Sequence, residues 1–95
     1  MSIMRVNLFA TLRDIVGGDS VEVDFEAGSS ARQLIETVVA QYPALETVLL
    51  DESRCLKKSL KMFISGREVV YLEGQFQHVL ESTDTVDIFP PIGGG

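Results

Sequence analysis

A single amphipathic helical segment, flanked by segments of alternating polarity, is the feature that most restricts the fold of this chain. It begins at Ser30, whose side chain can cap a helix, and Gln33 three residues later completes a capping box. Pro43 prevents the helix from continuing beyond about Gln41. The apolar residues between these limits recur at helical spacing: Ala31, Leu34, Ile35, Val38 and Tyr42. One helix with one apolar face is typical of a helix that packs across a sheet.

Period-two alternation predicts the strands of that sheet. Residues 4–12 alternate, a Gly-Gly turn follows at 17–18, and residues 21–25 alternate again, which indicates a hairpin whose connection at 12–16 can hold a helical turn. After the helix, residues 44–50 form a weaker helical or irregular piece. Strands are then predicted at 61–65, 68–71 and 85–89, with turns at 66–67 and 82–84 and a single 3₁₀ turn within 76–80. The order β-β-α-β-β-β predicts an α+β domain of the β-grasp type, with about five strands in a mixed sheet.

The β-grasp plan gives this sheet two different faces, because its first and last strands lie side by side at the centre. Apolar residues are expected to face the helix: Val6, Leu8, Ala10, Met62, Ile64, Val86 and Ile88. Alternation then places Phe9, Phe63 and Phe89 on the opposite face, where no helix covers them. A contiguous aromatic patch is typical of a docking surface, although loops or the chain end can also cover such rings.

Size and charge exclude several classes of function. A chain of 95 residues forms one domain and leaves no room for a large catalytic cleft. The net charge of −6 argues against nucleic acid as the main partner and suits docking on basic protein surfaces. No apolar run approaches the roughly 18 residues that a membrane helix needs, and the N-terminus lacks a signal-peptide pattern. We therefore expect a cytoplasmic protein with no membrane partner.

Cys55 and His78 are the only residues of their types, so no disulfide within the chain and no metal site is expected. Cys55 lies in a basic connection with Arg54, Lys57 and Lys58, which we interpret as a solvated segment carrying an incidental thiol. His78 has no partner set and is interpreted as a surface or turn residue. A ferredoxin, which is also a β-grasp protein, is excluded because one cysteine cannot hold an iron–sulfur cluster.

The C-terminal residues carry the strongest functional signal. We divide the chain into a β-grasp domain at 1–89 and an extended tail at 90–95. Pro90 and Pro91 stiffen the exit from the last strand, Ile92 follows, and Gly93, Gly94 and Gly95 remove every β-carbon from the end. Six extended residues reach about 20 Å. Such a tail is thin enough to deliver a terminal carboxylate into a narrow channel, whereas the alternative interpretation is a frayed end.

The ending from Ile88 to Gly95 resembles the C-terminus of the MoaD-type proteins, the small subunits of molybdopterin synthase within the ubiquitin-like MoaD/ThiS sulfur carriers. The resemblance covers nearly the whole chain, with further similarity at 6–14, 28–34 and 64–72. Two departures are a third glycine, Gly93, and the turn at 82–84, where a glycine before the aspartate is usual.

The resemblance implies a function. An E1-like adenylating enzyme would consume ATP to activate the carboxylate of Gly95, and a sulfur donor protein would convert the adenylate to a thiocarboxylate. Gly94, Gly93, Ile92, Pro91 and Pro90 would form the tail, which inserts into a MoaE-type large subunit and gives sulfur to a pterin precursor in molybdenum cofactor biosynthesis. Phe9 and Phe89 match the docking face of the family, and Phe63 joins them by alternation. The chain would bind no cofactor and would not be an enzyme on its own.

Three alternatives remain open at this point. The same tail chemistry would serve tRNA thiolation or thiamine synthesis. It would also serve a ubiquitin-like modifier joined to lysines through Gly95. The third alternative is a β-grasp interaction module whose tail is idle.

Overall fold

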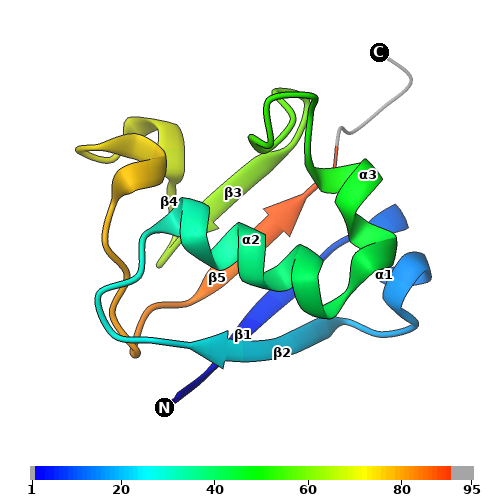
Figure 1. Cartoon of the computed structure of the whole chain (residues 1–95), viewed down its shortest axis with the longest axis horizontal. Helices are drawn as coiled ribbons and strands as arrows, with labels where there is room; N and C mark the ends of the chain where they lie inside the picture. The colour runs from blue at the N-terminus through cyan, green and yellow to red at the C-terminus, as the bar shows by residue number, and fades with distance from the viewer. Residues whose placement is uncertain (1, 91–95) are drawn as a thin grey trace.

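A five-stranded mixed sheet in the order β2-β1-β5-β3-β4 forms the frame of the protein (Figure 1). The computed structural model describes residues 2–90. Strand β1 (Ser2–Leu8) pairs antiparallel with β2 (Ser20–Phe25) and parallel with β5 (Val86–Phe89). Strand β3 (Lys61–Ile64) pairs antiparallel with β5 and with the short β4 (Arg67–Glu68). The first and last strands are therefore central neighbours, as predicted.

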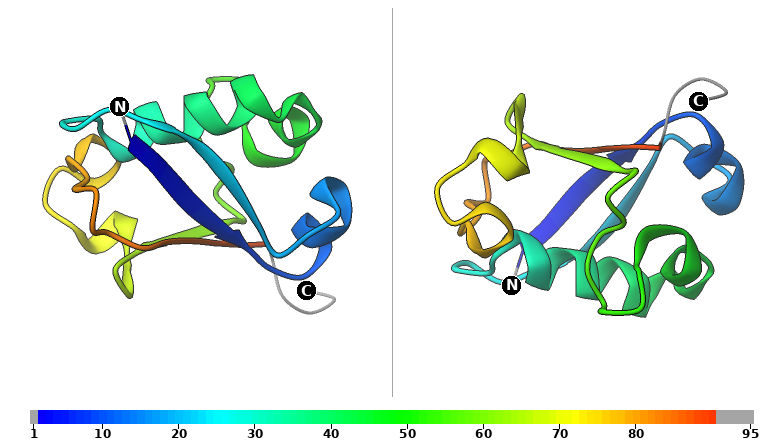
Figure 2. Two further views of the ribbon diagram at one scale, coloured as in Figure 1. Left: turned by 90° about the horizontal axis from the view of Figure 1, so that it is seen from below. Right: turned by 90° about the horizontal axis from the view of Figure 1, so that it is seen from above.

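Helix α2 (Ala31–Gln41) lies across one face of this sheet (Figure 2). The Oγ of Ser30 accepts a hydrogen bond from the Gln33 N–H, and the Gln33 side chain accepts one from the Ser30 N–H, so the predicted capping box is formed. Proline at 43 ends the helix and starts a 3₁₀ segment, Pro43–Leu45, followed by α3 (Glu46–Leu49). Two further 3₁₀ segments, Val69–Tyr71 and Gln75–Gln77, lie between β4 and β5. None of the helices within residues 2–90 is long and apolar enough to cross a membrane.

The core fills the space between the sheet and α2. The residues that α2 contributes to it are Ala31, Leu34, Ile35, Val38 and Val39. The sheet contributes residues that were expected on this face, all of them buried: Val6, Leu8, Met62, Ile64, Val86 and Ile88. The opposite face of β1, β5 and β3 carries no helix within residues 2–90 (Figure 2).

The structure corrects the predicted end of the first strand. The alternating stretch was expected to continue to Leu12, with Ala10 facing the helix, but β1 ends at Leu8 and Ala10 is exposed. Ala10 has a φ of 52°, which breaks the strand and starts α1 (Thr11–Val16), so the next buried residue is Leu12. Polarity alternation cannot report a positive φ at a non-glycine residue.

The fourth strand is also shorter than predicted. The turn consists of Ser65 and Gly66, both with positive φ, and β4 contains only Arg67 and Glu68. The expected strand at 68–71 is instead a 3₁₀ segment from residue 69, because a 3₁₀ turn buries Val69 and leaves Tyr71 exposed. Two adjacent β-branched valines favour a strand locally, and tertiary packing overrides that preference.

Candidate functional site

The parallel pairing of β1 and β5 brings together two phenylalanines that are far apart in the sequence. The parallel register ends at Leu8 and Ile88. The next residues are Phe9, which directly follows β1, and Phe89, which is the last residue of β5 and also pairs with Lys61 of β3. Their rings stack with centroids 4.2 Å apart and an interplanar angle of 13°. The ring of Phe63 meets Phe89 edge-on, at 5.4 Å and 84°.

We call Phe9, Phe63 and Phe89 the aromatic face. All three are half-buried and lie on the side of the sheet away from α2. Aromatic pairs of these geometries contribute about 0.5–1.5 kcal/mol each beyond the area that they bury. The cluster is therefore preformed, and it keeps apolar ring surface available beside the point where the chain leaves β5.

Arg13 extends this cluster, and sequence reasoning missed it. Its guanidinium carbon lies 5.0 Å from the centroid of the Phe9 ring, and its Nε donates a hydrogen bond of 2.7 Å to the carbonyl of Leu8. The contact depends on α1 turning back over the end of β1, which the sharp turn at Ala10 produces. The available signal in the sequence was that Phe9 and Arg13 are four residues apart. The strand predicted over residues 4–12 would have kept their side chains apart, so no contact was expected.

An open depression of about 490 Å³ lies beside the rings. Its lining comes from β3, β5 and the connections next to them: Ser59, Lys61, Phe63, Gly66, Asp87, Phe89 and Pro90. Within this lining the carboxylate of Asp87 accepts a hydrogen bond of 2.8 Å from the Asn7 side chain, which ties β5 to β1. Pro90, which the sequence placed in the tail, is buried and belongs to this wall.

Five predicted tail residues lie outside the described residues: Pro91, Ile92, Gly93, Gly94 and Gly95. Their proposed role as carrier tail therefore stays a prediction. What the structure provides is the root of this segment at Pro90, next to the aromatic face.

The charged groups with displaced pKa values are not part of the aromatic face. The guanidinium of Arg54 donates to Glu36 (2.7 Å) and to Glu46 (3.1 Å), and these hydrogen bonds raise the pKa of Arg54. They tie Arg54 of the basic connection to α2 and α3, a contact that the sequence did not predict. Cys55, the next residue, is exposed, which is consistent with the predicted solvated segment. Within residues 2–90, no group of three His, Cys, Asp or Glu side chains could hold a metal ion.

Comparisons with known proteins agree with this fold. Residues 6–95 match the family described as the ThiS family. Small archaeal modifier protein 3 of Haloferax volcanii is 29% identical over 92 residues, which are 97% of this chain and 98% of that protein. The molybdopterin synthase sulfur carrier subunit of Chlamydomonas reinhardtii is 25% identical over 92 residues, again 97% and 98% of the two chains.

A crystal structure supports the predicted β-grasp architecture. Small archaeal modifier protein 1 of Haloferax volcanii is similar with a TM-score of 0.86 and 23% identity, over 99% of this chain and 100% of that one. At this identity the likeness is one of fold, and it confirms the predicted ubiquitin-like sheet with its helix.

Proposed function

Because this chain belongs to the ThiS family, we propose that it carries sulfur as a thiocarboxylate on Gly95. As a member it is a small ubiquitin-like carrier or modifier and not itself an enzyme. Within this proposal, the group that reacts is the carboxylate of Gly95. On an adenylating enzyme the Gly95 carboxylate attacks the α-phosphate of ATP and releases pyrophosphate, which leaves an acyl-adenylate. Sulfide-level sulfur from a sulfur donor protein then attacks the acyl carbon and displaces AMP, which leaves the thiocarboxylate. The match to the family continues through residue 95, which supports the choice of this glycine.

The observation that carries the proposal is the position of the aromatic face at the root of the tail. The stacked Phe9 and Phe89 lie where β1 and β5 end, and Pro90 follows directly. A partner that binds this face receives residues 91–95 at a fixed starting point. Since a carboxylate is a poor acyl donor, activation as a mixed anhydride is required, and the resulting thiocarboxylate offers a nucleophilic sulfur much as a thiolate does.

For the acceptor pathway we propose molybdopterin synthesis, with a MoaE-type large subunit as partner in the cytoplasm. The resemblance of the ending Phe89-Pro90-Pro91-Ile92 to MoaD-type proteins supports this assignment, as does the similarity to a molybdopterin synthase sulfur carrier subunit. In this scheme the carrier binds no cofactor of its own, because ATP is consumed on the adenylating enzyme.

A second candidate, conjugation to protein lysines through Gly95, is favoured by the similarity to small archaeal modifier protein 3. The same adenylate serves both fates, since either a sulfur donor or a lysine amine can displace AMP from it. The two candidates differ in product, a thiocarboxylate in one case and an isopeptide bond in the other.

Intact mass spectrometry of the protein from its native host tests the proposal directly. Replacement of one carboxylate oxygen by sulfur adds about 16 Da, and we expect this species after incubation with ATP, a sulfide source and the adenylating enzyme of the host. Isopeptide-linked remnants on cellular lysines without any thiocarboxylate would favour the modifier. If an intact protein gains no mass while the enzyme activates another carrier, the sulfur-carrier proposal is wrong.

A further inference from the structure

The free edge of the sheet at β2 presents backbone groups that no other strand uses. The Leu8 N–H donates to the carbonyl of Asp19 (2.8 Å), which fixes the phase of the antiparallel pairing between β1 and β2. Alternate residues of β2 therefore direct their backbone N–H and C=O groups away from β1: Ser20, Glu22 and Asp24. The N–H of Asp24 confirms this phase because it donates to Gln41 Oε1 of α2 (2.9 Å).

Along this edge the pairing groups are only partly satisfied. The side-chain amide of Gln41 occupies the N–H of Asp24 as a neighbouring strand would. The outward N–H and C=O groups of Ser20 and Glu22 have no partner among residues 2–90. Unpaired groups of this kind form a template onto which an extended chain can add as a further strand.

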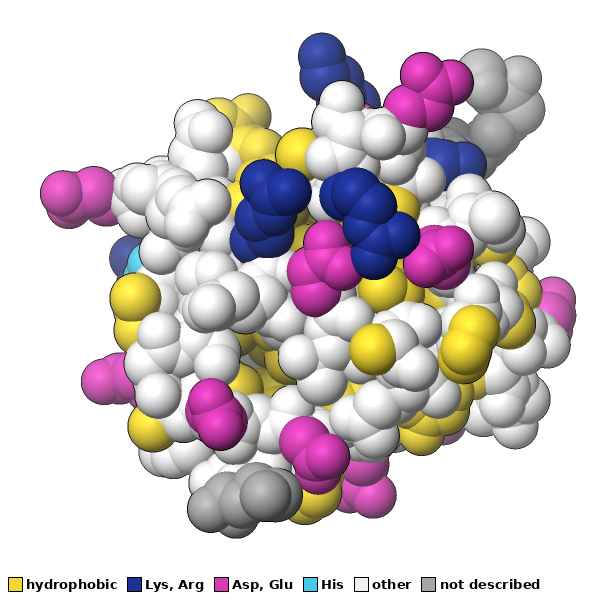
Figure 3. All heavy atoms as spheres, viewed as in Figure 1, with side chains coloured by type: hydrophobic (Ala, Val, Ile, Leu, Met, Phe, Trp, Pro, Cys, Tyr) yellow, Lys and Arg dark blue, Asp and Glu magenta, His cyan; other side chains and the backbone are white. Residues whose placement is uncertain are grey.

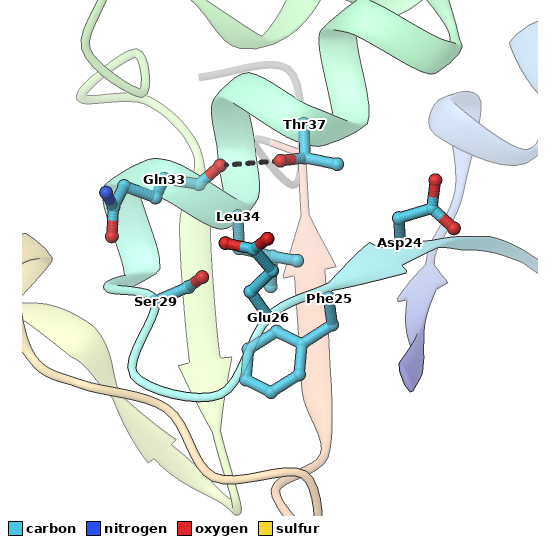
Figure 4. A pocket seen from close by; sticks show the side chains of 7 residues that line it. All are labelled: Asp24, Phe25, Glu26, Ser29, Gln33, Leu34 and Thr37. Atoms are coloured by element: carbon cyan, nitrogen blue, oxygen red, sulfur yellow. Dashed lines mark hydrogen bonds between the residues drawn. The ribbon is translucent and has the colours of Figure 1, made fainter. Parts of the chain in front are cut away.

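A depression of about 370 Å³ lies beside this edge, between β2 and α2 (Figure 4). Asp24, Phe25 and Glu26 line it from the strand side, and Gln33, Leu34 and Thr37 line it from the helix, with Ser29 at the connection. Phe25 and Leu34 are buried and form an apolar floor, whereas the side chains of Asp24 and Glu26 are exposed at the rim. The depression lies at the Asp24–Glu26 end of the edge, so a side chain of an added strand that points toward α2 at this end would enter it.

The charge along the edge selects the occupant. Four carboxylates lie at Asp19, Glu22, Asp24 and Glu26, and residues 14–31 contain no Lys or Arg. Two basic residues border this group: Arg5 of β1 lies directly opposite Glu22, and Arg13 Nε lies 4.0 Å from Asp19 Oδ1. Asp24 and Glu26, beside the depression, form no ion pair within residues 2–90. In the view of Figure 3 the lower part of the molecule, where β2 runs, likewise shows Asp and Glu side chains and no basic ones. A second copy pairing through the same edge would bring these carboxylates against each other, so identical copies are disfavoured.

We propose that the β2 edge binds an extended, basic segment of a partner protein as a sixth strand. On the face that Glu22 and Asp24 share, the added strand carries Lys or Arg side chains, and toward α2 it carries small apolar side chains that lie over Phe25 and Leu34. The added strand replaces Gln41 at the N–H of Asp24. This surface is separate from the aromatic face, so it allows a second partner to bind while the tail is engaged.

A titration of the full-length ¹⁵N-labelled protein with two synthetic peptides tests the proposal. One peptide alternates lysine and valine, and its matched control alternates glutamate and valine. With the lysine peptide we expect the amide signals of Ser20 and Glu22 to shift and their hydrogen exchange to slow about tenfold or more, because these N–H groups become hydrogen-bonded. The glutamate peptide should change neither.

Three variants separate backbone pairing from charge. Glu22→Pro removes one outward N–H without removing a bond to β1, and Asp24→Lys reverses one rim charge. Each should weaken lysine-peptide binding about tenfold or more, whereas the matched Glu73→Lys, on a connection outside β2 and α2, should leave it within about twofold. If Glu22→Pro does not fold, Asp24→Lys and the exchange data decide. The proposal is overturned if the peptide fails to bind, if it shifts the aromatic face instead, or if Glu73→Lys weakens binding equally.

Discussion

At the scale of single residues, the aromatic face depends on a backbone conformation that alanine rarely adopts. Ala10 has a φ of 52° and a ψ of −129°, and this turn directs the chain from Phe9 into α1. The turn places Arg13 over the Phe9 ring and within hydrogen-bonding distance of the Leu8 carbonyl. The strained backbone of Ala10 therefore positions the Arg13 guanidinium beside the stacked rings.

Ala10→Gly should stabilise the fold. Glycine adopts a positive φ without steric cost, which relieves about 1–3 kcal/mol of strain, and its greater freedom in the unfolded chain costs about 0.4–1 kcal/mol. We expect the free energy of unfolding in urea to rise by about 1 kcal/mol. Ala27→Gly, at an exposed loop position without a positive φ, should lower it. Equal losses in both variants would show that Ala10 is unstrained.

Asp84 should contribute to the loss of stability in acid. A hydrogen bond from the Glu81 N–H (2.8 Å) is the main cause that lowers the pKa of Asp84 below its ordinary value of 3.8, and a bond from the Ser65 hydroxyl (2.7 Å) adds to it, against a partial opposing effect of burial. Because the folded pKa is depressed, the stabilisation is complete above 3.8 and is lost as the pH falls below that value through the folded pKa.

Asp84→Asn should therefore be less stable than wild type at pH 7, and the difference should shrink as the pH approaches 2. Urea denaturation at a series of pH values measures this convergence. Glu52→Gln, at an exposed residue that bonds to no other side chain within residues 2–90, is the control and should follow the wild-type profile. A constant difference between Asp84→Asn and wild type at all pH values would contradict the assigned role.

At the scale of secondary structure elements, α2 is the element that was most fully predictable. Its limits follow from local rules, because Ser30 and Gln33 cap its start and Pro43 stops it. Most of its buried face was also predicted, but Val39 is buried in addition, and Tyr42, which the spacing placed on this face, is only half-buried. Ser30 is buried, so water competes only weakly with its capping bond. The helix therefore owes part of its stability to one side chain.

Ser30→Ala should lower the free energy of unfolding by about 1 kcal/mol, since loss of a Ser cap costs about 0.5–2 kcal/mol. Ser30→Asp, which can still accept the Gln33 N–H, should recover most of this loss. Chemical denaturation followed by circular dichroism measures both variants. If Ser30→Asp is as unstable as Ser30→Ala, the site is limited by packing and not by capping.

The strands could be predicted where apolar and polar residues alternate regularly along the chain. They could not be predicted where tertiary contacts determine the backbone conformation. Phe63 and Phe89 lie where period two places them, because β3 and β5 are regular and adjacent. The end of β1 and the 3₁₀ segment at Val69 were missed, since a positive φ and a buried turn leave no periodic trace. The position of Arg13 was missed for the same reason, because it depends on the direction of α1 and not on a pattern in the sequence.

At the scale of the whole molecule, the fold separates two tasks. The sheet presents the aromatic face near Pro90, and the chemistry is assigned to residue 95, beyond the described part of the chain. The proposed sulfur chemistry takes place at residue 95, so we assign recognition of the partner to the sheet and its aromatic face. Docking and sulfur transfer should therefore respond to different mutations.

Phe89→Ala and deletion of Gly95 test this separation. Phe89 contacts both other rings, so its loss should weaken binding to the adenylating enzyme about 30-fold, as for a central interface residue worth about 2 kcal/mol. Deletion of Gly95 should leave that affinity within about threefold and abolish the sulfur-dependent mass gain. Titration calorimetry and intact mass measure the two effects.

The matched control is Tyr71→Ala, which removes an 84% exposed aromatic ring outside the aromatic face and should change neither affinity nor sulfur loading. Circular dichroism must show that all three variants keep the fold, since the ring pairs of Phe89 also stabilise it. Sulfur loading of the Gly95-deleted chain would refute the terminal glycine as the carrier. Wild-type affinity in Phe89→Ala would instead remove the aromatic face from docking while leaving the carrier chemistry intact, so each half of the proposed function can fail on its own.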